Sequence, residues 1–309
     1  MRRYKTFCSC IQGNGHVAKG TPCQDKTSAL QQNGVTALSL CDGAGSRRLS
    51  HHGAACVART TCRFLCDQFD ESFAQEDASV VKQDMYKAVG DMLQKTAWLL
   101  GCVTDDLACT WLFVAVKGNH FLAGHLGDGA IGVVRTDGQA AVLSKPFNGE
   151  CANQTVFFTT NGSISEFHLY KGSVEGLQGF IMFSDGAGDS LYENRTGTLA
   201  KYAVNLIGQA VKKPEDVMDR LLERKVLPLL RKRTSDDCSV GILTICVPKD
   251  THSHGLDRYE KSILHLVSAP FRKRTKRLNP KTKHARKALQ SLKRKRLIVR
   301  KGEHWFARQ

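Results

Sequence analysis

The sequence predicts an α+β fold in which antiparallel sheets pack in layers with helices. Predicted helices come in pairs and predicted strands come in runs, so the chain lacks the strict alternation of strand and helix that marks a parallel α/β fold. At least one pair of strands flanks Asn33-Gly34, a dipeptide typical of tight hairpin turns. Together these patterns favour sheets built from hairpins.

The first half of the chain predicts strands, then two long helices, then a run of strands. Apolar residues recur at spacings of three and four in the first of these helices, as one buried helix face requires. In chain order, the expected elements are a strand at 4–12, a loop at 13–20, a hairpin of strands at 27–30 and 35–41, helices at 50–69 and 78–100, and strands at 109–116, 120–126, 130–135 and 140–143.

The second half predicts further strands, a group of helices and a closing strand. Pro214 suits the first turn of one of these helices, because proline lacks the amide hydrogen that this turn leaves unpaired. The expected elements are strands at 156–159 and 179–183, helices at 188–192, 199–211 and 214–230, and a last strand at 238–247.

Charge divides the 309 residues into two parts. Residues 249–309 hold 19 lysines and arginines against 4 acidic residues, a net charge of +15, whereas the first 248 residues carry only +1. This asymmetry predicts a domain at 1–248 and a strongly basic C-terminal tail at 249–309.

The tail has basic clusters at 271–277 and 292–301, with Trp305 and Phe306 near its end. Such clusters suit non-specific contact with nucleic acid, here through 272–301, and residues 284–297 could form a basic helix. The tail could equally dock on the domain or on an acidic partner.

The remaining composition indicates a cytoplasmic protein that does not enter a membrane. No apolar stretch is long enough to span a bilayer, and no apolar segment of signal-peptide type follows Arg2 and Arg3. The twelve cysteines lie mostly in apolar runs, where reduced cysteines act as small core residues.

Short acidic segments are the most informative feature of the chain. Most of them follow an apolar, strand-like run and precede a glycine. One such pair would only mark a turn, but carboxylates gathered at several strand ends form an oxygen-rich site for Mg²⁺ or Mn²⁺. The candidate ligands are Asp25, Asp42, Asp128, Asp185, Asp189 and Asp236.

The order of these motifs resembles that of the metal-dependent protein phosphatases, the type 2C Ser/Thr phosphatase family, over about residues 4–247. Each motif alone is weak, and their order and spacing carry the resemblance, with a version closest to a bacterial-type branch. The motifs are Gln24-Asp25, Asp42-Gly43-Ala44-Gly45-Ser46, Gly127-Asp128-Gly129, Ser184-Asp185-Gly186 with Asp189, and Asp236-Asp237-Cys238.

The resemblance implies a four-layer αββα sandwich of two antiparallel sheets flanked by helix pairs. It also implies two bound Mg²⁺ or Mn²⁺ ions and, in some relatives, a third. By motif matching, Asp42 would bridge both ions and Asp185 and Asp236 would complete one of them. Asp25 and the Gly43 carbonyl would help to hold the other. Positions matching Asp128 and Asp189 are associated with the third ion.

The implied reaction is hydrolysis of phosphoserine and phosphothreonine in proteins. Two divalent ions neutralise the phosphoryl oxygens and lower the pKa of a water molecule, which then attacks phosphorus. Asp42 and Asp185 are therefore counted among the catalytic residues. The phosphoprotein would be a partner Ser/Thr kinase or a target of that kinase.

Three positions depart from the pattern of many relatives. A histidine that could protonate the leaving group is replaced by Ala44, a phosphate-binding arginine by Gly20, and a glutamate by Gln24. His16 and Lys19 are candidates for phosphate binding or proton transfer, or else they are ordinary loop residues.

These departures leave another class of function open. The chain could be a catalytically weak phosphoprotein-binding scaffold whose basic tail contacts nucleic acid or an acidic partner. In a third interpretation, the tail tethers an active phosphatase to DNA or RNA.

Overall fold

The computed structural model describes residues 3–147, 155–246, 291–292, 298–301 and 304–307. The chain divides into two compact units, Met1–Cys246 and Val247–Gln309. Among the described residues, no helix is both long and apolar enough to cross a membrane.

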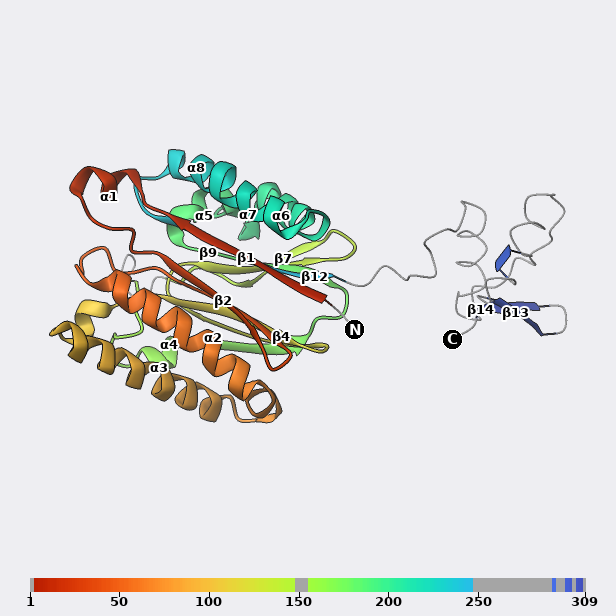
Figure 1. Ribbon diagram of the computed structural model, residues 1–309, viewed down its shortest axis with the longest axis horizontal. Coiled ribbons are helices and arrows are strands. Elements are labelled where there is room, and N and C mark those ends of the chain that lie inside the picture. Colours follow the sequence, from red (N-terminus) through yellow and green to blue (C-terminus); the bar gives the residue numbers. More distant parts are fainter. Residues whose placement is uncertain (1–2, 148–154, 247–290, 293–297, 302–303, 308–309) are drawn as a thin grey trace. The chain divides into compact units, whose positions relative to one another are not determined.

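Two five-stranded antiparallel sheets form the centre of the first unit (Figure 1). In spatial order, the first sheet consists of β1 (Arg3–Ile11), β12 (Cys238–Cys246), β9 (Leu177–Phe183), β6 (Ala130–Arg135) and β7 (Ala140–Ser144). The second consists of β2 (Lys26–Gln32), β3 (Val35–Cys41), β4 (Trp111–Lys117), β5 (His120–Leu126) and β8 (His168–Ser173).

Helices cover the outer face of each sheet (Figure 1). The second sheet is covered by α2 (Ser50–Ala74) and α3 (Ala78–Leu100), and the first by α5 (Asp185–Leu191), α6 (Lys201–Lys212), α7 (Glu215–Leu221), a π turn (Leu222–Val226), α8 (Leu227–Leu230) and a 3-10 turn (Arg231–Arg233). Shorter elements are α1 (Asn14–Lys19), a 3-10 turn (Thr104–Leu107), α4 (Ser163–Glu166) and the strand pair β10 (Tyr192–Glu193) and β11 (Thr198–Leu199).

Three apolar clusters hold the four layers together. Strand β3 shows how one sequence serves two of them, since alternate side chains of a strand point to opposite faces. Val35 and Ala37 pack in the cluster beneath α2 and α3, whereas Leu38 and Leu40 pack in the cluster between the sheets. The third cluster lies beneath the helices of the first sheet. The predicted αββα sandwich is therefore confirmed.

Two of the predicted elements are wrong. The expected loop at 13–20 contains the short helix α1, which ends at Gly20 with a left-handed φ of 67°. Tertiary contacts hold this helix, because the Gly15 amide donates to the Ser235 carbonyl (2.8 Å). The expected strand at 156–159 is a turn-containing loop, held by backbone bonds from the Phe158 amide to the Cys109 carbonyl (2.8 Å) and from the Thr160 amide to the Phe157 carbonyl (3.0 Å).

Other elements differ in extent. Strand β8 has no counterpart among the predictions, and the expected helix at 214–230 is interrupted by the π turn. The predicted hairpin turn is confirmed, since Asn33 and Gly34 have the positive φ angles of 53° and 76° that a tight hairpin of this type needs.

In the second unit, β13 (Ile298–Lys301) pairs antiparallel with β14 (His304–Ala307). Of the predicted basic helix at 284–297, only residues 291–292 are described, and these are helical. Most of the predicted nucleic-acid segment 272–301 likewise lies outside the described residues.

Candidate metal centre

Three aspartates from separate strand ends meet at one edge of the sandwich. Asp42 directly follows β3, Asp128 lies in the connection from β5 to β6, and Asp185 follows β9 and starts α5. Each offers a carboxylate oxygen, and these oxygens all lie within 4.8 Å of one another. Because β3 and β5 belong to one sheet and β9 to the other, the cluster joins the two sheets.

The backbone around Asp42 is fixed by the neighbouring segment 108–110. The Asp42 amide donates to Thr110 Oγ1 (2.9 Å), and the Thr110 amide donates back to the Asp42 carbonyl (2.8 Å). Gly43 forms a β-bridge with Cys109. These bonds engage the main chain of Asp42, so its carboxylate stays available to the cluster.

Glycines beside the aspartates allow the backbones to approach closely. A Cβ at Gly186 would lie 2.0 Å from the Asp237 carbonyl oxygen and 3.4 Å from Asp236 Cβ. A Cβ at Gly43 would lie 2.8 Å from Ser50 Oγ. At both positions a side chain would collide with a neighbouring segment, so glycine allows the loop that carries each carboxylate to pack closely.

Two buried carboxylate oxygens lack hydrogen-bond partners among the described residues. Asp25 is fully buried; its Oδ2 accepts from Ser184 Oγ (2.7 Å), but its Oδ1 has no partner. Asp128 Oδ2 accepts from Thr155 Oγ1 (2.5 Å), and its Oδ1 has none. Buried polar atoms without partners are costly, and hard divalent cations bind carboxylate oxygens. The residues present therefore fit a divalent metal ion.

Burial and mutual repulsion raise the pKa values of the clustered acids. Burial is the main cause that raises the pKa of Asp25 to about 7 and that of Asp185 to about 6, and the charge of Asp128 adds to the second shift. Desolvation of the half-buried Asp42 carboxyl, together with the charges of Asp25 and Asp185, raises its pKa well above its usual range. Asp42 thus interacts with the carboxylates of both residues.

These shifts predict how the stability of the metal-free protein depends on pH. The folded state holds protons on Asp25 and Asp185 more tightly than the unfolded state does, and this difference stabilises the folded protein at low pH. The stabilisation is fully present below pH 3.8, the ordinary pKa of an aspartate, and is lost as pH rises to about 7. Thermal unfolding in a chelator should show a melting temperature that falls over this range. Saturating Mg²⁺ should reduce the fall, and an equal fall with and without Mg²⁺ would contradict the assignment.

Asp236 and Asp237 are neighbours with different environments. The Asp236 side chain is exposed, and its charge is one of the causes, after burial and the charge of Asp128, that raise the pKa of Asp185. Asp237 is buried, and its two oxygens accept from the amides of Gly13 (2.6 Å) and Gln24 (2.5 Å). Asp237 therefore ties three loops of the centre together, a role that the sequence signals only by its place beside Asp236.

Comparison with known proteins places the chain in a family. A family profile described as Protein phosphatase 2C matches residues 12–223, more than half of the chain. The chain belongs to the protein phosphatase 2C family. It is accordingly a protein-serine/threonine phosphatase by class, as the motif order predicted.

Solved structures agree with the fold of a protein phosphatase 2C domain. A bacterial serine phosphatase is 14% identical with a TM-score of 0.55, and the match covers 81% of this chain and 100% of that one. The S. agalactiae serine/threonine phosphatase is 16% identical with a TM-score of 0.52, over 79% and 100% of the two chains. No curated protein sequence matches. At these identities the likeness confirms the sandwich architecture.

Three other predicted site residues, His16, Lys19 and Asp189, lie on the short helices α1 and α5. His16 is half-buried in α1, where its Nδ1 lies 3.0 Å from Asp237 Oδ1, so it contacts the loop-tying carboxylate. Lys19 is exposed at the end of α1, and Asp189 is exposed in α5, one turn after Asp185. Neither belongs to the three-carboxylate group in the described part of the chain.

Gln24 has a positioning role in this phosphatase that the sequence does not reveal. Its side chain is buried, and Nε2 donates to the Arg47 carbonyl (2.8 Å) and to Ser50 Oγ (2.6 Å). A weaker contact reaches the Ala44 carbonyl (3.3 Å). The amide thus holds the loop that follows Asp42.

Gln24→Glu should destabilise the fold. The substitution replaces a donor by a buried carboxylate that faces carbonyl oxygens, which costs about 2–4 kcal/mol. Chemical denaturation measures the loss, with the exposed Gln32→Glu as the matched control. Unchanged stability of Gln24→Glu would mean that the loop is held in another way.

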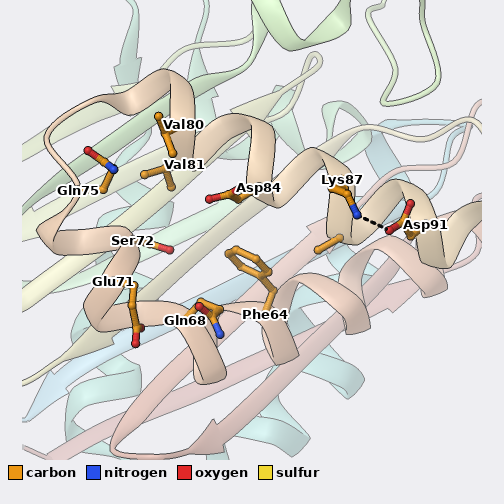
Figure 2. Close-up of a pocket in the computed structure, with 11 residues that line it drawn as sticks. Phe64, Gln68, Glu71, Ser72, Gln75, Val80, Val81, Asp84, Lys87 and Asp91 are labelled. Atoms are coloured by element: carbon orange, nitrogen blue, oxygen red, sulfur yellow. Dashed lines mark hydrogen bonds and ion pairs between the residues drawn. The ribbon is translucent and has the colours of Figure 1, made fainter.

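A groove elsewhere on the unit does not coincide with the site. It measures about 470 Å³ and lies between α2 and α3 (Figure 2). Its lining includes Phe64, Val80 and the ion pair of Lys87 with Asp91 (3.3 Å), but none of the predicted metal ligands.

Proposed function

We propose that this protein hydrolyses phosphoserine and phosphothreonine in proteins at a Mg²⁺ or Mn²⁺ centre. The meeting of Asp42, Asp128 and Asp185 within 4.8 Å is the observation that carries the proposal. Asp25, with its unpaired buried oxygen, and Asp236, whose charge acts on Asp185, complete the proposed ligand set.

Each ligand has a proposed place. The charges of Asp25 and Asp185 both act on Asp42, and this supports Asp42 as the ligand shared by two ions. Asp185 and Asp236 would hold one ion, and Asp25 with the Gly43 carbonyl the other. Asp128 and Asp189 are the candidates for a third ion.

Divalent ions at such a centre neutralise phosphoryl oxygens and lower the pKa of water, which supplies the nucleophile. The chain's own residues orient the ligands. The Ser184 hydroxyl donates to Asp25 (2.7 Å) and accepts from the Ser239 amide (3.0 Å), so it fixes one carboxylate. Thr155 fixes Asp128 in the same way.

The leaving alkoxide needs a proton that position 44 does not provide. Ala44 is buried and has no ionisable group. His16 and Lys19 on α1 stay the candidates for proton transfer or phosphate binding, and His16 Nδ1 lies 3.0 Å from Asp237 Oδ1.

The lack of a histidine at Ala44 also favours a second candidate, a phosphoprotein-binding scaffold of low activity.

We further propose a phosphorylated partner of a Ser/Thr kinase system as substrate, a cytoplasmic location, and a basic tail that begins near residue 249. Truncation at about residue 248 tests whether the tail binds nucleic acid, because salt-dependent binding should then disappear.

The decisive experiment is hydrolysis of a phosphothreonine peptide by purified protein after treatment with a chelator. Turnover should be absent until Mn²⁺ or Mg²⁺ is added back, and then be restored. A folded protein that binds the phosphopeptide but does not hydrolyse it with any divalent ion would support the scaffold instead.

A further inference from the structure

Four basic residues form a rim beside the candidate metal centre. The basic rim comprises Lys19 at the end of α1 and Arg231, Lys232 and Arg233 in the 3-10 turn after α8. Arg231 is half-buried, and its Nη1 donates to the Gln12 carbonyl (3.4 Å), which fixes the turn against the chain before α1. Lys19, Lys232 and Arg233 are exposed and form no ion pair within the described ranges.

The basic rim borders the proposed metal ligands. Arg233 precedes Asp236 by three residues, so their Cα atoms lie within about 11 Å of each other. Helix α1 lies against the same segment, since the Gly15 amide donates to the Ser235 carbonyl (2.8 Å) and a Cβ at Gly13 would lie 2.3 Å from the Asp236 carbonyl oxygen. Figure 1 shows α1 and α8 at the same end of the unit.

The positive charge of the rim is local. Residues 1–248 carry a net charge of only +1. Along the helical segment that ends in the rim, all four acids, Glu215, Asp216, Asp219 and Glu223, lie in the first part. Arg220 pairs there with Asp216 (2.5 Å), and the last ten residues, 224–233, hold five basic residues and no acid. The next acid, Asp236, acts on the carboxylates of the metal centre. Unpaired cations at the border of a site attract anionic ligands and set their orientation.

We infer that the basic rim binds acidic residues that flank the phosphorylated residue of the protein substrate. An extended peptide advances about 3.3 Å per residue, so acids three or four positions from the phosphoresidue span about 10–13 Å, enough to cover the Cα separation of at most about 11 Å between Arg233 and Asp236. The inference rests on the proposed function, and it names the substrate class: phosphoserine or phosphothreonine in an acidic sequence.

Three substrates test the inference with Mn²⁺ present: p-nitrophenyl phosphate, a phosphothreonine peptide with acidic flanks, and the same peptide with alanine flanks. Wild type should hydrolyse the acidic peptide with a kcat/KM about tenfold higher than the alanine peptide, and the preference should shrink as salt rises from about 0.05 M to about 0.5 M.

The variant Lys232→Glu/Arg233→Glu should hydrolyse the acidic peptide with a kcat/KM about tenfold below that of wild type, so that the preference over the alanine peptide disappears. Its activity on p-nitrophenyl phosphate, which has no flanking residues, should equal that of wild type. The matched control is Arg224→Glu/Lys225→Glu, also exposed and on the same helical segment, which should keep the preference. Circular dichroism and thermal melting establish that both variants fold.

Each outcome decides the inference. Equal rates for the two peptides in wild type, or a preference that survives in Lys232→Glu/Arg233→Glu, would overturn it, and the wild-type comparison stands even where a variant does not fold. If Lys232→Glu/Arg233→Glu loses activity equally on all three substrates, the rim binds the phosphate group and not the flanking acids. Inhibition by a short DNA strand, abolished in this variant and without a peptide preference, would assign it to nucleic acid. Absence of turnover on every substrate would instead remove the proposed function.

Discussion

Asp42→Ala is expected to abolish metal-dependent hydrolysis, with a loss in kcat of at least about 10³-fold, or roughly 4 kcal/mol of activation free energy. Asp42 belongs to the three-carboxylate cluster, and the charges of both Asp25 and Asp185 act on it, so it is the proposed ligand shared by the two ions. Hydrolysis of p-nitrophenyl phosphate and of a phosphothreonine peptide at saturating Mn²⁺ measures the effect.

The same substitution should not unfold the metal-free protein. Removal of one carboxylate from a cluster with raised pKa values relieves repulsion, so the melting temperature in a chelator at pH 8 should equal or exceed that of wild type. Stabilisation by Mn²⁺ should be lost, because an ion that no longer binds the native state cannot stabilise it. The exposed Asp84→Ala on α3 is the control and should behave as wild type. Full activity in Asp42→Ala would exclude this centre as the site of hydrolysis.

Asp236→Ala and Asp237→Ala should have different effects although the residues are adjacent: the first should lower turnover, and the second should lower stability. Asp237 is buried and accepts the amides of Gly13 and Gln24, so its loss leaves buried donors unpaired and should cost about 3 kcal/mol of unfolding free energy. For a domain of this size, that corresponds to a melting temperature lower by about 6–12 °C.

Asp236 is exposed and faces the clustered charges, so Asp236→Ala should lower metal-dependent turnover by about 10²-fold or more with little change in stability. Asp237→Asn keeps one acceptor oxygen and serves as the conservative control. Thermal melting and Mn²⁺-dependent kinetics of all three variants check the pair. A large loss of stability in Asp236→Ala, or none in Asp237→Ala, would reverse the two roles.

The sequence predicts the elements whose apolar patterns are strong. The bounds of α3 are those expected, because Asp77 caps its start through the Ser79 amide (2.8 Å) and Gly101 ends it with a left-handed φ of 64°. Helix α1 could not be predicted, since it is six residues long and lies against Ser235, which is remote in sequence. Strand β8 could not be predicted either, because its mixed sequence HLYKGS gives little alternation.

The candidate site likewise contains residues that the sequence predicts and residues that it does not. Aspartates that end apolar strands can be found from sequence, and Asp42, Asp128 and Asp185 do meet. Residues that act by holding loops, such as Gln24 and Asp237, carry no such signal, because their partners are remote in sequence. Gln24 binds the Arg47 carbonyl 23 positions away, and Asp237 accepts from the Gln24 amide 213 positions away. Their roles follow only from the folded arrangement of the loops.

Calorimetric titration of Mn²⁺ into wild-type protein freed of metal tests the central claim most directly, with Asp42→Ala beside it. The proposed ligand set predicts saturable binding of two ions by wild type, with binding of at least one lost in Asp42→Ala. Absence of binding in folded wild type, or identical binding in both proteins, would contradict a metal centre at Asp42, Asp128 and Asp185.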